Sequence, residues 1–179
     1  MRIVVSGTHA SGKSTLIADF ARLHPAYEVL PDPYEEMALD AFDELDAGLF
    51  ATQLEIAAAR LEELPARADA IAERGPMDFA AYLDAIVGLG RRGRSSTMLR
   101  TGLARSEAVL AHVDLWVILP LSAVDRIHVS EDEDPELREA MNDALLEHAD
   151  AASLAGATVL EVTGTPDERL ALLQRATGP

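Results

Sequence analysis

A glycine motif near the N-terminus constrains the fold of this chain more than any other feature of the sequence. Residues 7–14 read GTHASGKS and match G-x-x-x-x-G-K-[ST] at every required position. A short β-branched run at residues 2–5 precedes the motif, and helical periodicity follows it from residue 13 to residue 21. A strand, a glycine loop and a helix in this order predict a phosphate-binding loop, and with it a nucleoside triphosphate site.

Each residue type in the motif has a mechanical role. Glycines let the backbone wrap closely around an anion, and successive N–H groups at the helix start point at the phosphates. Lys13, the only lysine in the chain, can reach the β- and γ-phosphates, and the Ser14 hydroxyl can bind Mg²⁺. We therefore expect ATP and Mg²⁺ as cofactors, with nucleotide contacts from Gly7, Thr8, His9, Ala10, Ser11, Gly12, Lys13, Ser14 and Thr15.

Length and charge limit what the chain can be. Its 179 residues are typical of one domain, and a hydrophobic fraction of 49% is enough for a packed core. The formal net charge of −16 repels nucleic acid and anionic membrane surfaces, and no cysteine is present to form disulfides. No apolar run approaches the ~18 residues of a membrane span. We expect one cytoplasmic domain over residues 1–179, monomeric or homodimeric, with a small-molecule partner.

Strand and helix signals alternate along the whole chain. Apolar runs predict strands at residues 2–5, 27–30, 113–119 and 157–162. A further strand is expected at the alanine-rich segment 68–72, because residues 73–76 (ERGP) resemble a strand-to-helix junction. Helical periodicity occurs at residues 13–21, 77–89, 97–111, 135–154 and 166–176, with two further helices between 34 and 64 that are interrupted near Gly48, and a short one ending near 128. This alternation implies an α/β domain with a mainly parallel sheet between helical layers.

Four segments carry a wider resemblance, which runs nearly end to end: GTHASGKSTL, ERGPMDFAAYL, the apolar strand leading to Arg126, and EVTGTPDERL. Together they resemble small P-loop kinases of the nucleoside and nucleotide kinase type, including ribosylnicotinamide-kinase-like ATPases. Only the first segment is specific by itself. The resemblance implies a three-layer P-loop fold with a five-stranded sheet of order 2-3-1-4-5, and a helical lid at about residues 121–138.

The resemblance also implies a catalytic carboxylate. Asp32 stands where nucleoside kinases often place the group that accepts the acceptor hydroxyl's proton, and Glu35 is a second carboxylate nearby. A carboxylate within hydrogen-bond reach orients the hydroxyl and takes its proton late in transfer. The alternative is an aspartate that only stabilises the turn Pro31-Asp32-Pro33.

Glu73 and Arg74 resemble the Asp-Arg pair that follows the third strand in many of these kinases. Glu73 can hold a water bound to Mg²⁺, and Arg74 can fix the acceptor or its phosphate. The alternative is an ion pair at a strand end. Asp78, Phe79 and Tyr82 follow on the next helix, where they can contact a flat acceptor, although Phe79 suits the core equally well.

Two later regions complete the expected site. Arg126 stands where a lid arginine neutralises charge that develops at phosphoryl transfer, and Arg138 is a second, weaker lid candidate. Gly164, Thr165 and Pro166 resemble the loop that touches adenine, although a helix cap explains them fully. We thus expect Lys13, Asp32 and Arg126 to be catalytic, and Asp32, Glu35, Arg74, Asp78, Phe79 and Tyr82 to bind the acceptor.

The expected reaction is transfer of the γ-phosphate of ATP to a hydroxyl of a nucleoside or nucleotide-like compound. Three alternatives remain open at this point. The same chemistry can act on an antibiotic or another natural product, or the nucleotide can control a protein partner in a regulatory NTPase. The sequence lacks the N-K-x-D guanine signature expected of many such switches. The third alternative is an inactive relative that only binds nucleotide, since Glu73 stands in place of the usual aspartate.

Overall fold

The computed structural model describes residues 1–37, 47–91, 95–121 and 134–178. The strands in these ranges are β1 (Arg2–Ser6), β2 (Glu28–Leu30), β3 (Ala70–Glu73), β4 (Leu115–Ile118) and β5 (Val159–Glu161). The helices are α1 (Lys13–Leu23), α2 (Ala47–Glu63), α3 (Pro76–Gly88), α4 (Ser95–Leu110), α5 (Pro135–Leu154) and α6 (Pro166–Thr177). A short 3₁₀ helix, η1 (Pro33–Glu36), follows β2.

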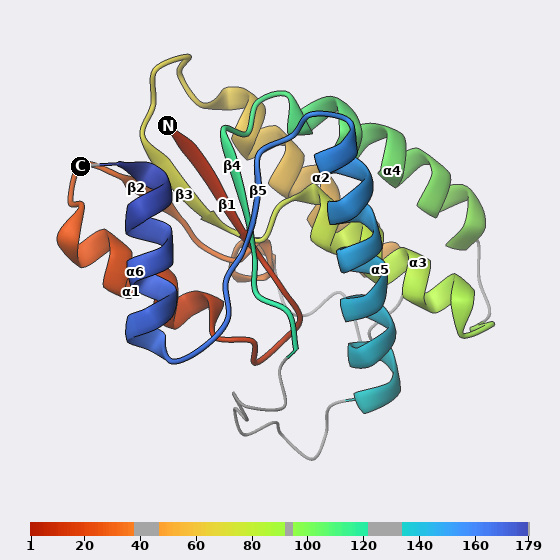
Figure 1. Ribbon diagram of the computed structural model, residues 1–179. Helices are drawn as coiled ribbons and strands as arrows, with labels where there is room; N and C mark the ends of the chain where they lie inside the picture. The colour runs from red at the N-terminus through yellow and green to blue at the C-terminus, as the bar shows by residue number, and fades with distance from the viewer. Residues whose placement is uncertain (38–46, 92–94, 122–133, 179) are drawn as a thin grey trace.

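The strands form one parallel sheet of order β2-β3-β1-β4-β5 (Figure 1). This confirms the order that the resemblance implied. β1 lies at the centre, where Ile3 pairs with Ile71 of β3 on one side and Leu115 of β4 on the other. Because all strands run the same way, the loops after β1, β2 and β3 meet at one edge of the sheet, which is where parallel sheets place their ligands.

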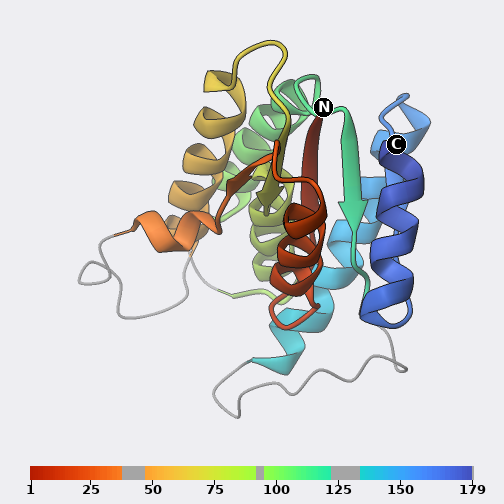
Figure 2. The ribbon, with the colours of Figure 1, turned by 90° about the vertical axis from the view of Figure 1, so that its left-hand side faces the viewer.

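Helices cover both faces of the sheet. α1 and α6 lie on one face of the sheet, and α2 to α5 lie on the other (Figure 1). Figure 2 shows the molecule from the side of α1 and α6. The strands alternate accordingly: Ile3 and Val5 pack under α1 and α6, while Val4 packs against the larger helical layer. The result is the expected three-layer arrangement.

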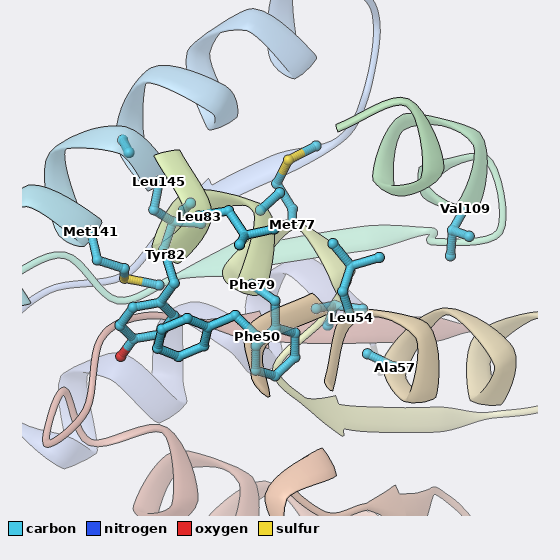
Figure 3. Close-up of a cluster of buried hydrophobic side chains, with 14 of the residues drawn as sticks. Phe50, Leu54, Ala57, Met77, Phe79, Tyr82, Leu83, Val109, Met141 and Leu145 are labelled. Carbon is cyan, nitrogen blue, oxygen red and sulfur yellow. The ribbon is translucent and has the colours of Figure 1, made fainter. Parts of the chain in front are cut away.

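α3 is the central helix of the larger layer. It is buried over almost its whole length because α2, α4 and α5 pack around it. Side chains of α3 such as Phe79 and Leu83 meet Phe50 and Leu54 of α2 in the core (Figure 3). Pro76 occupies the first turn of α3, where its missing N–H costs nothing. The residues that follow β3 are therefore anchored in the protein interior.

Several predicted boundaries shift in the structure. The strand expected at 68–72 is β3, which ends at Glu73, and α2 begins at Ala47, so that Gly48 lies in its first turn. The strand expected to begin at Tyr27 is β2, which begins one residue later at Glu28. The Tyr27 ring packs edge-on to Phe20. Of the expected helices between 34 and 64, the first lies partly outside the described residues, and so does most of the expected lid.

No helix within the described ranges is both long enough and apolar enough to span a membrane.

Candidate active site

A cavity of about 650 Å³ opens at the edge of the sheet where β1, β2 and β3 end. Its wall combines the glycine loop with residues from η1, α2, β3, α3 and α5. The lining consists of residues 9–15 together with Asp32, Tyr34, Glu35, Phe50, Gln53, Glu73, Arg74, Phe79, Tyr82, Asp134, Leu137 and Arg138. The structure thus brings together most of the residues predicted for both halves of the site.

The glycine loop is closely packed at its base. A Cβ atom at Gly7 would lie 2.6 Å from the Ser11 hydroxyl and 2.8 Å from the Leu119 carbonyl oxygen, so only glycine fits there. Gly12 has a φ of 93° and leads directly into α1, whose first turn contains no acidic side chain. The free N–H groups at this helix start form a site for an anion. Gly7 and Thr8 are themselves buried and lie outside the cavity lining.

Lys13 is almost completely buried, with 4% of its surface exposed. Its Nζ donates to the Thr8 carbonyl oxygen at 2.8 Å. Burial, followed by repulsion from Arg74, lowers the pKa of Lys13 to about 7. A phosphate group beside this amine would restore its charge, because an anion favours the protonated form.

Two arginines donate hydrogen bonds to carbonyl oxygens of the glycine loop. Arg138 of α5 donates from Nε to the His9 carbonyl oxygen at 3.0 Å and from Nη2 to that of Ala10 at 3.3 Å. Arg169 of α6 donates to the Ser11 carbonyl oxygen at 2.7 Å. These contacts fix the carbonyl oxygens of the loop. The sequence analysis missed Arg169, although it lies in the segment EVTGTPDERL that carried the resemblance.

Ser14 and Glu73 meet across the cavity, where the Ser14 hydroxyl donates to Glu73 Oε1 at 2.8 Å. A hydroxyl and a carboxylate oxygen are hard ligands that suit Mg²⁺, which takes its other ligands from phosphates and water. Within the described part of the chain, no three or more His, Cys, Asp or Glu side chains gather into a metal site. The Ser14–Glu73 pair would supply two oxygen ligands to Mg²⁺, and the phosphates of a nucleotide would supply others.

Asp32 and Arg74 form an ion pair on the other side of the cavity. Arg74 Nε donates to Asp32 Oδ2 at 2.7 Å, and the Tyr34 backbone N–H donates to Oδ1 at 3.0 Å. The Asp32 side chain remains 23% exposed. Burial opposes the charge of Arg74, but Tyr82, Asp32 and Asp78 together hold the pKa of its guanidinium above the usual value.

Arg74 is held in an unusual backbone conformation, with a φ of 65°. Its guanidinium lies 5.5 Å from the ring centre of Tyr82 and 6.0 Å from that of Phe79. Its Nη1 is buried without a hydrogen bond among the described residues. Strained residues of this kind gather at functional sites, and the unpaired N–H groups can bind an acceptor oxygen.

Aromatic side chains form the inner wall. The rings of Phe50 and Tyr82 stack face to face, with centroids 4.5 Å apart and planes 1° apart (Figure 3). Gln53 lies in the same wall with only 5% of its surface exposed. The sequence analysis missed Gln53. The signal that could have found it is a polar residue on the otherwise apolar buried face of α2.

The remaining predicted residues lie elsewhere. Glu35 lines the cavity and is exposed. Asp78 is completely buried and does not line the cavity, so it is not placed for the substrate contact that the sequence predicted. Thr165 caps α6 by a reciprocal pair of hydrogen bonds with Glu168. Gly164, Thr165 and Pro166 are outside the cavity lining, and Arg126 is outside the described residues.

A glycine loop between the central strand and the first helix of a parallel 2-3-1-4-5 sheet defines a P-loop nucleotide-binding protein with the fold of the P-loop kinases. The chain belongs to the AAA domain family, whose model matches residues 2–169.

Solved structures share this fold over nearly the whole chain. Deoxyadenosine kinase from M. mycoides with bound dATP is 19% identical, with a TM-score of 0.72 and 99% of each chain covered. Thymidylate kinase from Candida albicans is 16% identical, with a TM-score of 0.68, and the match covers 98% of this chain and 89% of that chain. The NadR protein in complex with NR is 18% identical, with a TM-score of 0.70, and the match covers 99% of this chain and 52% of that chain. No curated protein matches the sequence.

Proposed function

We propose that this protein is an ATP- and Mg²⁺-dependent kinase that transfers the γ-phosphate to a hydroxyl group of a nucleoside or nucleotide-like small molecule. One observation carries the proposal: a single cavity holds Lys13 and the Ser14–Glu73 pair on one side, and the Asp32–Arg74 pair on the other. The fold shared with deoxyadenosine kinase and thymidylate kinase supports the same class of reaction.

The nucleotide half uses groups that bind and neutralise phosphate. The N–H groups of the glycine loop surround the phosphates, and Lys13 pairs with the phosphate that is transferred. Ser14 and Glu73 would hold Mg²⁺, which when bound offsets the charge of the phosphate oxygens. Arg138 lines the cavity beside His9 and stabilises the loop in the shape that receives the anion.

The acceptor half uses Asp32 as a base. Its carboxylate accepts the proton of the acceptor hydroxyl as that oxygen forms a bond to the γ-phosphorus, and the bond from the γ-phosphorus to the β-bridging oxygen breaks to release ADP. Arg74 orients Asp32 through the 2.7 Å hydrogen bond. The Nη1 group of Arg74 can bind an oxygen of the acceptor and stabilise charge at transfer.

The inner wall suits a flat acceptor with a polar edge. Phe79 and the stacked pair of Phe50 and Tyr82 offer apolar area, and the Gln53 amide offers one acceptor oxygen and two N–H donors. A heterocyclic base or a ring carboxamide satisfies both requirements. The NadR structure in the comparison contains NR, which supports including ribosides of this type among the candidate acceptors.

A phosphoryl-transfer screen tests the proposal. Purified protein is incubated with ATP, Mg²⁺ and a panel of nucleosides, nucleotides, nicotinamide riboside and aminated sugars, and mass spectrometry detects products that gain one phosphate. The matched control is Lys13→Met, which we expect to abolish transfer. Transfer only to aminated sugars would favour a natural-product kinase. ATP hydrolysis that responds to a protein and to no small molecule would favour a regulatory NTPase and contradict the proposal.

A further inference from the structure

Asp78 has no exposed surface, and every polar group around its carboxylate is a hydrogen-bond donor. Oδ1 accepts from the backbone N–H of Gly7 at 3.0 Å, and Oδ2 accepts from the backbone N–H of Gly75 at 2.9 Å. The Ser6 hydroxyl donates to Oδ2 at 2.5 Å and accepts from Trp116 Nε1 at 2.7 Å. An ionised carboxylate satisfies this arrangement, because its two oxygens accept from the three donors around it.

The two backbone N–H groups belong to different halves of the cavity. Gly7 begins the phosphate-binding loop, and Gly75 directly follows Arg74. Both glycines pack too closely for a side chain, since a Cβ at Gly75 would lie 2.8 Å from Val4 Cγ1. One planar carboxylate therefore joins the start of the loop to the turn that carries Arg74, in addition to the hydrogen bond from the Arg74 N–H to the Val5 carbonyl oxygen at 3.0 Å.

Helix capping alone does not require this arrangement. Asp78 is the third residue of α3, where a carboxylate commonly accepts from the N-cap N–H, here that of Gly75. The bond to Gly7 is additional and reaches a separate segment of the chain. Burial raises the pKa of Asp78, while Arg74 and the three hydrogen bonds oppose that effect. Arg74 and the three hydrogen bonds thus favour the charged form at this buried position.

Resting on the proposed function, we propose that Asp78 is a positioning residue that couples occupancy of the phosphate-binding loop to the placement of Arg74 in the acceptor half. Phosphates that order the loop fix Gly7, and the shared carboxylate transmits this restraint to Gly75 and the Arg74 turn. Such coupling is reciprocal, so an acceptor bound at Arg74 also tightens nucleotide binding. Nucleotide then tightens the placement of Arg74 in an acceptor half whose Asp32–Arg74 pair is already formed.

Hydrogen exchange with and without a non-hydrolysable ATP analogue and Mg²⁺ tests this coupling. In the unaltered protein we expect the analogue to slow exchange in residues 7–15 and also, by about tenfold, in residues 73–79. Asp78→Asn removes the charge and one acceptor oxygen, so slowing should persist at 7–15 and fall below about twofold at 73–79. Asp84→Asn, on the same helix but paired with His148, is the matched control and should behave like the unaltered protein.

A second route between the same segments runs through the Ser14–Glu73 hydrogen bond. If Asp78→Asn keeps the slowing at 73–79, the coupling does not run through Asp78 and the proposal is wrong; loss of the slowing in Glu73→Gln would then assign it to that second route. Slowing confined to 7–15 in the unaltered protein also overturns it. Phosphate transfer in the screen together with either result would leave the proposed function intact.

Trp116 gives a reading that does not depend on whether Asp78→Asn folds. It is the only tryptophan, and Ser6 joins its indole N–H to Asp78. Binding of the analogue should change Trp116 emission in the unaltered protein and in Asp84→Asn. The change should disappear in Ser6→Ala, which keeps both backbone bonds to Asp78 but breaks the link to the indole. Unchanged emission on binding in the unaltered protein contradicts the proposal.

Discussion

Arg74 Nε and Asp32 Oδ2 lie 2.7 Å apart, although the two residues follow different strands. Asp32 comes after β2 at the edge of the sheet, and Arg74 comes after β3 beside the centre. The pair therefore joins the segment that carries the proposed base to the rigid start of α3. This ion pair links the two segments of the acceptor half, so a mutation in one segment should alter the position of the other.

Asp32→Asn tests the proposed base. An amide keeps the shape of the side chain but cannot take a proton, so kcat should fall about 100-fold or more, while the affinity for ATP changes less than about threefold. Steady-state kinetics and calorimetry measure the two quantities. Asp19→Asn on the outer side of α1, where Asp19 pairs with Arg22, is the control. Unchanged turnover in Asp32→Asn would remove this residue from the mechanism.

Lys13 predicts a pH dependence of nucleotide binding. Its pKa in the free protein is about 7, and bound phosphate raises it, so binding takes up a proton above pH 7. The affinity for ATP should be constant below pH 7 and fall by up to about tenfold per pH unit above it. Calorimetry in two buffers of different ionisation enthalpy measures the proton uptake. Equal heats at pH 8 would show that Lys13 is already charged in the free protein.

Glu73→Gln tests the metal pair. The amide retains one oxygen that can accept from Ser14 but loses the negative charge that attracts Mg²⁺. The Mg²⁺ concentration needed for half-maximal transfer should rise about tenfold, and excess Mg²⁺ should restore part of the rate. Titration of transfer against Mg²⁺ gives the result. A chelator should abolish transfer in both proteins, and activity that survives it would exclude the metal role.

Gln53→Leu tests how the acceptor is selected. The change keeps the approximate volume and removes the polar group from the inner wall, so the KM for the acceptor should rise more than tenfold with little change in the KM for ATP. Comparison of the two KM values in one assay separates the effects. If both rise together, Gln53 supports the fold of the cavity and does not contact the acceptor.

Thr165→Ala separates the two interpretations of the last loop. Loss of the cap on α6 should lower the free energy of unfolding by about 1 kcal/mol in a urea titration. Because Thr165 lies outside the cavity lining, the KM for ATP should stay within about twofold. A large rise in that KM at unchanged stability would instead favour the adenine contact.

The sequence predicted the fold and the glycine loop between the first strand and the first helix, the fold from the alternation of strand and helix signals and the loop from a local pattern. The glycine loop has a fixed pattern, and the sheet order followed from the resemblance. Arg169 and Gln53 could not be predicted in the same way, because each acts on residues far away along the chain, and helical spacing shows which face is buried without showing what it meets. Asp78 was expected to contact substrate because it neighbours Phe79. Its position three residues after Gly75 is instead the local signal for a cap.

Arg169 has a consequence for how the protein is made. The loop that begins at Gly7 needs a hydrogen bond from α6, near the other end of the described chain, before all of its carbonyl oxygens are fixed. The chain must therefore be synthesised beyond residue 169 before this hydrogen bond can complete the loop. Nucleotide that binds the completed site stabilises the folded protein, because it binds the folded state and not the unfolded chain.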